Sequence, residues 1–528
     1  MIIKLGMLFV FFAVTIGIGL YCRKHSTDVN GFVLGGRSVG PWLTAFAYGT
    51  SYFSAVVFVG YAGQFGWKYG IAATWAGIGN ALLGSLLAWA VLGRRTRIMT
   101  QHLDSATMPQ FFESRFKSPA LKLAASAIVF IFLIPYTASL YNGLSRLFAM
   151  AFDIDYAWCV IIMAVLTGIY VIAGGYMATA INDFIQGIVM IVGIVAVIAA
   201  VLNMNGGFLG ALDALNAVEA TAHDVDKLML PLAEVGKTGL FGSFFGPDPV
   251  NLLGVVILTS LGTWGLPQMV QKFYAIKNEK QIGKGMIIST IFAVIVAGGC
   301  YFLGGFGRLY ADKIDVVANG YDSVIPTMLE GLPTVLIALV IVLVLAASMS
   351  TLSSLVLTSS STLTLDFIKG KIVKDMDEKK QLLVMRALIV VFIAISVVLA
   401  IVQHKSAVTF IAQLMGVSWG ALAGAFLAPF LYGLYWKRTT PVAVWCSFIF
   451  STVFMLAVIL APGIFPSILR SPINAGAFCM IAGLIIVPVV SLVTPRLHKA
   501  YVDEIFSCYD RTVTVHVTDS IGETADND

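Results

Sequence analysis

The chain has 528 residues, of which 59% are hydrophobic and only 12% are charged, and its mean hydropathy is +0.90. A soluble protein of this length would carry about 25% charged residues, so the composition excludes an ordinary soluble enzyme. The net charge of +5 is modest, and we expect no nucleic-acid partner. Six cysteines without a CxxC pair predict neither a disulfide framework nor a thiolate metal site.

Long apolar runs of roughly 20 residues have the length of a bilayer-spanning helix. We count about thirteen of them, which predicts an all-α polytopic membrane protein. The first run is interpreted as a retained span and not a signal peptide, because its positive residues follow the apolar stretch. In chain order the runs lie near residues 3–22, 41–65, 72–93, 121–150, 156–174, 182–203, 251–271, 285–307, 327–365, 383–402, 408–435, 441–461 and 472–494.

Basic residues concentrate in alternate connections between the spans, such as those that hold Arg94 and Arg95 or Lys437 and Arg438. The positive-inside rule makes these connections cytoplasmic. We therefore expect a plasma-membrane protein with its N-terminus outside and its C-terminus inside. The expected segments are a first span with a cytoplasmic loop (1–40), a first five-helix unit (41–203), an extracellular loop (204–250), a second five-helix unit (251–435), two C-terminal spans (436–495) and a short cytoplasmic tail (496–528).

Two predicted spans carry helix-breaking residues at their middles. The second span contains GTSYFS, which begins at Gly49, and the seventh contains GTWGLP, which ends at Pro267. Proline removes a backbone donor, and freed backbone groups are tolerated in lipid only where protein or a water-filled cavity satisfies them. Matched breaks in two halves indicate a transporter binding site. The alternative is that these residues only allow close helix packing.

The segment ASMSTLSSLVLTSSS (347–361) is rich in hydroxyl groups for an apolar span. Helical spacing puts Ala347, Ser350 and Thr351 on one face. Hydroxyl oxygens are hard, neutral ligands suited to hard cations, and carbonyls freed by a broken helix can complete such a site. The alternative is that the hydroxyls bond back to their own helix or to a neighbouring one.

Asp183 lies in the apolar stretch GGYMATAINDFIQG. Carboxylates inside a membrane are costly and are usually functional, so we interpret it as a transient stop for an ion that leaves toward the cytoplasm. The alternative is an interfacial residue at a helix start. We find no midplane carboxylate or histidine suited to proton coupling, and no catalytic motif that would indicate an enzyme. A proton-coupled carrier, a channel and a transport-like membrane sensor remain the alternatives to a cation-coupled carrier.

Five motifs in order resemble the sodium:solute symporter family, in particular its bacterial sodium/proline and sodium/pantothenate branch. They are GGRSVGPWLTAFAYGTSYFSA (35–55), GGYMATAINDFIQGIVMIVG (174–193), WGLPQMVQKF (264–273), ASMSTLSSLVLTSSS (347–361) and WGALAGAFLAPFLYGLYWKR (419–438). The resemblance covers residues 5 to 495. It implies a LeuT-type fold with two inverted five-helix repeats, sodium as the coupling ion and no further cofactor.

The resemblance also implies functional residues. A sodium ion is expected at the backbone oxygens of Thr50, Phe53 and Ala347 and the hydroxyls of Ser350 and Thr351, and the family's cytoplasmic aspartate falls on Asp183. The expected solute contacts are Ser54, Tyr136, Trp264, Pro267 and Gln268.

The implied function is sodium-coupled symport of a small organic solute into the cell by alternating access. We expect solute, sodium and lipid as partners and a functional monomer. The motifs disagree on the solute. Tyr52 stands where proline carriers have aspartate and is closer to the pantothenate branch, whereas the stretch around Tyr136 looks more like the proline carriers. Proline and pantothenate both remain candidates.

Overall fold

The computed structural model describes residues 2–510 apart from 26, 153–154, 228–233, 374 and 406–410. All regular elements in these residues are helical, and the one β feature among them is an isolated bridge between Val39 and Ile276. The predicted all-α class is therefore confirmed. Most of the predicted tail, residues 511–528, lies outside the described residues.

Within the described residues, ten helices are long and apolar enough to cross a membrane, or eleven if the bent pair Pro249–Gly265 and Pro267–Ala275 is one span. Two of these runs, Val56–His102 and Tyr156–Met204, have 47 and 49 residues. At 1.5 Å per residue each is about 70 Å long, more than twice the hydrocarbon thickness of a bilayer. Positive φ angles at Gly70 and Gly175 interrupt them. The predicted count of about thirteen is not confirmed; it is reached only if both runs are divided at these glycines.

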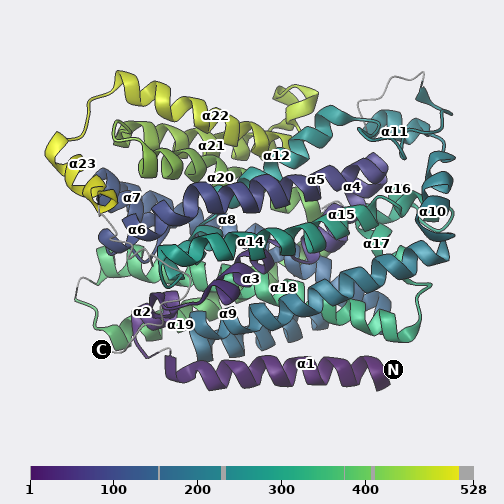
Figure 1. Ribbon diagram of the computed structural model, residues 1–528, viewed down its shortest axis with the longest axis horizontal. Coiled ribbons are helices and arrows are strands. Elements are labelled where there is room, and N and C mark those ends of the chain that lie inside the picture. Colours follow the sequence, from purple (N-terminus) through teal and green to yellow (C-terminus); the bar gives the residue numbers. More distant parts are fainter. Residues whose placement is uncertain are drawn as a thin grey trace, which may run out of the picture.

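The helices pack side by side, with α18 (Thr334–Thr362) in the middle of the bundle (Figure 1). It contacts α3 (Pro41–Tyr52), α8 (Pro119–Phe152) and α9 (Tyr156–Met204). Every residue of α18 from Val340 to Thr362 is buried. The hydroxyl-rich part of this helix therefore faces other helices on all sides and not lipid.

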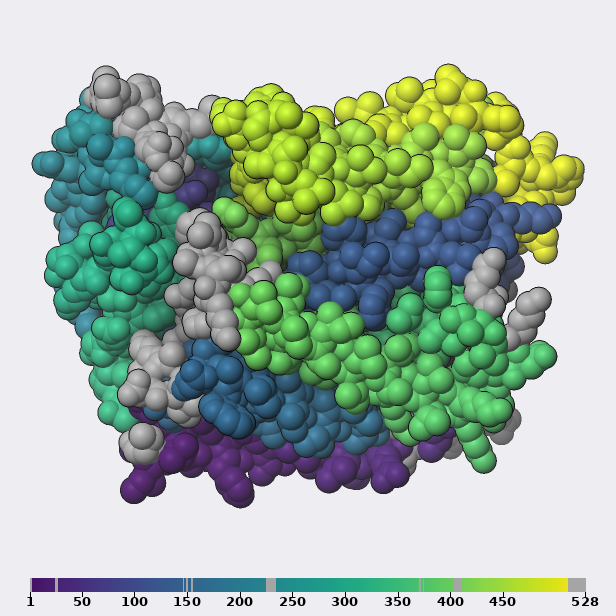
Figure 2. Space-filling model, turned by 180° about the vertical axis from the view of Figure 1, so that it is seen from behind, coloured from purple at the N-terminus to yellow at the C-terminus, as the bar shows by residue number. Residues whose placement is uncertain are grey.

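The outer helices frame this centre. In Figure 1, α1 (Ile2–Tyr21) runs along one edge, and α21 (Pro441–Leu460) and α22 (Pro472–Val493) run along the opposite edge. Figure 2 shows the back face, where α8, in blue, lies between α19 (Glu378–Lys405) and the C-terminal helices. Large apolar side chains such as Phe9, Val192 and Leu492 are exposed on the outer helices, as expected where lipid replaces water.

Short elements close the two ends of the bundle. At one end lie α10 (Gly207–Asn216), α11 (Ala222–Lys227) and α16 (Val316–Asn319) (Figure 1). At the other end lie α6 (Arg94–His102), α7 (Met108–Phe116) and α23 (Lys499–Phe506). The helix α1 begins at the first end and finishes at the second, so its start lies opposite α23.

Glycines permit two helices to meet backbone on backbone. A Cβ atom added at Gly304 of α15 (Gly299–Gly304) would lie 2.1 Å from the Ala62 carbonyl oxygen of α4 (Ala62–Tyr69). A Cβ at Gly66 would lie 1.9 Å from the Gly304 oxygen. Small residues bring membrane helices together in this way, and the contact fixes the part of the chain that follows the break in the second span.

Candidate cation and solute site

The second predicted span is broken as the sequence indicates. The helix α3 ends at Tyr52, and Phe53 has an extended backbone with φ −86° and ψ 117°. A new helical turn, η3 (Val56–Tyr61), starts after Ser54, whose hydroxyl accepts a hydrogen bond of 3.2 Å from the Val56 N–H. Ser54 thus caps the second half of the broken helix. The break frees backbone carbonyls at the end of α3 from regular helical bonding.

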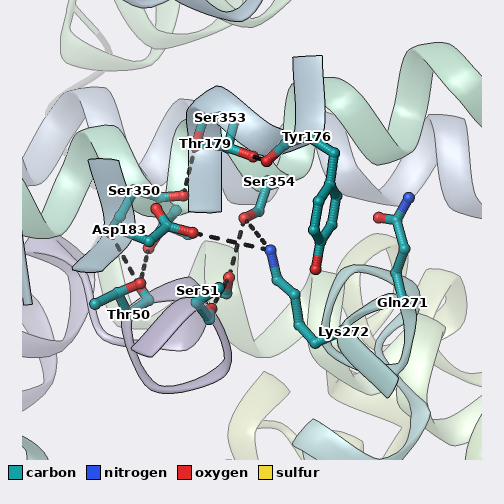
Figure 3. Close-up of polar contacts among 12 residues, drawn as sticks. Thr50, Ser51, Tyr176, Thr179, Asp183, Gln271, Lys272, Ser350, Ser353 and Ser354 are labelled. Atoms are coloured by element: carbon teal, nitrogen blue, oxygen red, sulfur yellow. Dashed lines mark hydrogen bonds and ion pairs between the residues drawn. The ribbon is translucent and has the colours of Figure 1, made fainter. Parts of the chain in front are cut away.

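These carbonyls meet the hydroxyl face of α18. Ser350 Oγ lies 3.1 Å from the Thr50 carbonyl oxygen and 3.0 Å from that of Ala347. Thr351 Oγ1 lies 3.1 Å from the oxygens of Thr50 and Ala347 and 3.2 Å from that of Phe53. All five residues are buried. The structure therefore brings together the five oxygens that were predicted to hold sodium. Figure 3 shows two of these residues, Thr50 and Ser350, side by side.

This oxygen cluster suits a hard monovalent cation. It consists of three carbonyl and two hydroxyl oxygens, all neutral, and hard cations prefer oxygen ligands. A divalent ion is usually held by carboxylates, and none belongs to the cluster. No group of three or more His, Cys, Asp or Glu side chains suited to a metal ion occurs in the described part of the chain.

Asp183 is fully buried in α9, well past the break at Gly175. Its Oδ2 lies 4.0 Å from Nζ of Lys272, which donates a 3.0 Å hydrogen bond to Ser354 Oγ. Asp183 lies eight residues past the interruption at Gly175, so it is not the first residue of a helix. Lys272 is a polar residue of this region that the sequence analysis did not single out. A lysine inside the apolar motif WGLPQMVQKF was the available signal, because charged residues within spans are rare and usually functional.

The seventh predicted span is broken as well. The helices α12 (Pro249–Gly265) and α13 (Pro267–Ala275) meet at Leu266, which is extended, and are bent by 45°. Pro267 occupies the first position of α13, where its missing N–H costs no hydrogen bond. Gln268 and Lys272 are four residues apart on α13 and so lie on one side of it.

The five predicted solute contacts fall into two groups. Trp264 and Ser54 already make hydrogen bonds, since Trp264 Nε1 donates to the Leu83 oxygen at 2.9 Å and Ser54 caps η3. Pro267 has no polar side-chain atom. By contrast, the Tyr136 hydroxyl and both amide atoms of Gln268 are buried and have no hydrogen-bond partner within the described residues. Buried polar groups are normally paired, so Tyr136 and Gln268 are the two contacts with unused polar atoms.

Further buried tyrosines share this property. The hydroxyls of Tyr52, Tyr61 and Tyr301 also have no hydrogen-bond partner in the part of the chain that is described. The Tyr136 ring packs edge-on against Trp419 with a centroid distance of 5.9 Å. The family resemblance singled out Tyr52, which stands where proline carriers have aspartate, whereas nothing in the sequence distinguished Tyr61 and Tyr301 from packing residues.

Two broken helices, a buried cluster of neutral oxygens and unused buried polar groups, all inside a bundle of membrane-length helices, define a membrane carrier for a cation and a small solute.

The sodium:solute symporter family model matches residues 32–450. The osmoregulated proline transporter OpuE of Bacillus subtilis (strain 168) is 28% identical over 504 residues, which are 94% of this chain and 96% of the relative. A sodium/proline symporter of Staphylococcus aureus (strain JH9) is 30% identical over 445 residues, 82% of this chain and 81% of the relative. The solved structure of a Na⁺-coupled sialic acid symporter has a TM-score of 0.73 at 17% identity, covering 94% of this chain and 99% of its own.

The chain belongs to the sodium:solute symporter family. It is a sodium-coupled solute transporter and not an enzyme, as the sequence predicted. The structural likeness to the sialic acid symporter bears on the fold alone and confirms the predicted LeuT-type class.

Proposed function

We propose that this protein carries proline into the cell together with sodium by alternating access, and that the oxygen cluster of Thr50, Phe53, Ala347, Ser350 and Thr351 holds the sodium ion. The convergence of these oxygens at the break of α3 is the observation that carries the proposal. The names of two relatives, a proline transporter and a sodium/proline symporter, support proline as the solute.

Sodium joins two parts of the molecule in this proposal. Thr50 and Phe53 belong to the first proposed five-helix unit (41–203), and Ser350 and Thr351 belong to the second (251–435). The two hydroxyls lie within hydrogen-bond distance of the carbonyls. With an ion, the hydroxyls turn their lone pairs toward it and all five oxygens share its charge. Neutral ligands bind a monovalent ion reversibly, as a coupling ion requires.

Gln268 and Tyr136 supply the polar contacts to the solute. Their unused donors and acceptors match the carboxylate and the ammonium group of an amino acid, and the rings of Tyr136 and Trp419, which pack together, match an apolar side chain. Ser54 and Trp264 shape the site through the hydrogen bonds they already make, and Pro267 shapes it by starting α13. Asp183 receives sodium on its way to the cytoplasm.

The end of the bundle that carries α6 and α23 is the cytoplasmic end, because Arg94 and Arg95 lie there and basic residues stay inside. The start of α1 is then outside.

The segment after α2 (Val29–Leu34) is tied to the end of α13 by two backbone hydrogen bonds. The Val39 N–H donates to the Ala275 oxygen at 3.2 Å, and the Lys277 N–H donates to the Val39 oxygen at 2.9 Å. The protein works in the lipid bilayer as a monomer and uses no cofactor besides sodium.

Uptake into proteoliposomes tests this function. Labelled proline, pantothenate and sialic acid are offered separately, with an inward sodium gradient or an equal potassium gradient. A potential of 100 mV adds about 2.3 kcal/mol per charge, which is enough for a roughly fiftyfold proline gradient from voltage alone. Sodium-dependent accumulation of proline alone supports the proposal. Accumulation of pantothenate instead would agree with Tyr52 and would replace proline as the solute.

A further inference from the structure

Lys272 is a buried lysine that belongs to neither the proposed sodium site nor the proposed solute site. Only 2% of its side-chain surface is exposed. Its ammonium group donates to Ser354 Oγ at 3.0 Å, lies 4.0 Å from Asp183 Oδ2 and sits 5.1 Å from the centre of the Tyr176 ring. Figure 3 shows Lys272 pointing from α13 toward α9 and α18. A charged side chain inside a membrane span is costly and rare, so the place of Lys272 needs an explanation.

The contact between Lys272 and Asp183 is loose. A direct bond between an ammonium and a carboxylate measures about 2.7–2.9 Å, whereas this pair is 4.0 Å apart. Both carboxylate oxygens of Asp183 lack a hydrogen bond to any other group that the structure describes. The lysine is bonded instead to the Ser354 hydroxyl. A shift of about 1 Å would therefore exchange the serine contact for a direct ion pair.

Lys272 is connected to the oxygen cluster through two hydrogen bonds. Ser354, which accepts from Lys272, also lies 2.9 Å from Ser51 Oγ. Ser51 directly follows Thr50, whose carbonyl contacts both hydroxyls of the cluster. The lysine thus lies between the place where sodium is proposed to bind and the carboxylate past which it is proposed to leave.

We propose that Lys272 is an internal counter-cation for Asp183: its ammonium pairs with the carboxylate in the empty carrier and gives way when sodium passes. This inference rests on the proposed sodium site. After release, the carrier has to return without an ion, and a buried carboxylate without a partner is strongly destabilising. The tethered ammonium neutralises it. When sodium sits beside Asp183, two cations share one carboxylate, and their repulsion favours release of the ion that is free to leave.

Two transport modes separate this role from a structural one. Net uptake, with sodium and proline outside only, requires the empty carrier to return. Exchange, with sodium and proline on both sides, uses only the loaded carrier. In Lys272→Met, net uptake falls at least about tenfold, the equivalent of 1.4 kcal/mol, while sodium-dependent exchange stays within about twofold of the unmodified protein. Internal sodium inhibits net uptake at a lower concentration. Lys272→Arg restores net uptake, and Lys284→Met, at an exposed lysine, changes neither mode.

Removing both charges provides a second variant. In Asp183→Asn with Lys272→Met no buried charge needs a partner, so net uptake recovers toward that of the unmodified protein and exceeds that of either single variant. Equal losses of net uptake and exchange in Lys272→Met, without rescue by arginine, would overturn the inference. If Lys272→Met does not reach the membrane, the inference is overturned when the double variant is no faster than Asp183→Asn. If uptake by the unmodified protein does not depend on sodium, the proposed sodium site is refuted instead.

Discussion

Replacing Ser350 by alanine removes one ligand of the proposed sodium site. Its hydroxyl lies 3.1 Å from the Thr50 carbonyl oxygen and 3.0 Å from that of Ala347, and a neutral hydrogen bond to such an oxygen contributes about 0.5–1.5 kcal/mol. In the sodium-bound protein it contacts a full charge, and a hydrogen bond to a charged group contributes about 1.5–3 kcal/mol. The difference of about 1–2 kcal/mol raises the half-saturating sodium concentration roughly five- to thirtyfold.

The assay is initial proline uptake into proteoliposomes at a clamped membrane potential, measured over a range of sodium concentrations. Ser360→Ala is the matched control, because Ser360 is equally buried on α18 and its hydroxyl bonds back to the Leu357 oxygen of its own helix. We expect less than a twofold change in that variant. Thr351→Ser keeps a hydroxyl and should preserve the sodium affinity better than Thr351→Val. Equal sodium affinities in Ser350→Ala and Ser360→Ala would refute the reasoning.

Three further predictions concern the solute, the buried ion pair of Asp224 with Arg308 and the packing of the helices. Gln268→Ala should raise the KM for proline about tenfold, as expected for one lost polar contact to a charged group, and leave the sodium requirement unchanged; an unaltered KM would remove Gln268 from the solute site. Burial alone would raise the pKa of Asp224, but the hydrogen bonds and charge of Arg308 outweigh it and hold that pKa below its ordinary value. The stabilisation is therefore complete above about pH 4 and is lost as the pH falls through the lowered pKa of the folded protein. Asp224→Asn should cost about 3 kcal/mol at neutral pH, seen as a lower melting temperature in detergent, and an unchanged melting curve would show that the pair contributes nothing. Gly304→Ala should destabilise the protein or prevent its folding, because the new Cβ would meet backbone atoms, whereas Gly6→Ala meets nothing within 4 Å; similar thermal stability of both variants would contradict the backbone contact.

Much of the fold follows from local sequence. Apolar runs fix the helices, and the two breaks follow from GTSYFS and GTWGLP, whose residues weaken or block regular helix. The fifth and sixth spans were predicted as separate helices, 156–174 and 182–203, with a connection of seven residues between them. The chain between residues 174 and 182 contains no proline, and the structure continues in one helical run with an interruption only at Gly175. A glycine with positive φ gives a weak sequence signal, because glycine is frequent in all membrane helices.

The residues of the proposed sites also divide into those that could be predicted from the sequence and those that could not. The five oxygens of the cluster lie in short motifs, and the family resemblance could therefore identify them. The structure brings these oxygens together. The contact of Lys272 with Ser354 and Asp183 joins three helices that are distant in the chain, and a single sequence carries no record of such pairings. The sequence alone also cannot predict that the hydroxyls of Tyr52 and Tyr301 have no hydrogen-bond partner among the described residues. Only their burial in the folded structure shows it.

Equilibrium binding of radioactive sodium to the purified protein tests the central claim most directly, because it needs no knowledge of the solute. We expect saturable binding to the unmodified protein and to Ser360→Ala, and loss of that binding in the double variant Ser350→Ala with Thr351→Ala. Sodium binding of equal affinity in the double variant would contradict the assignment of the oxygen cluster as the sodium site.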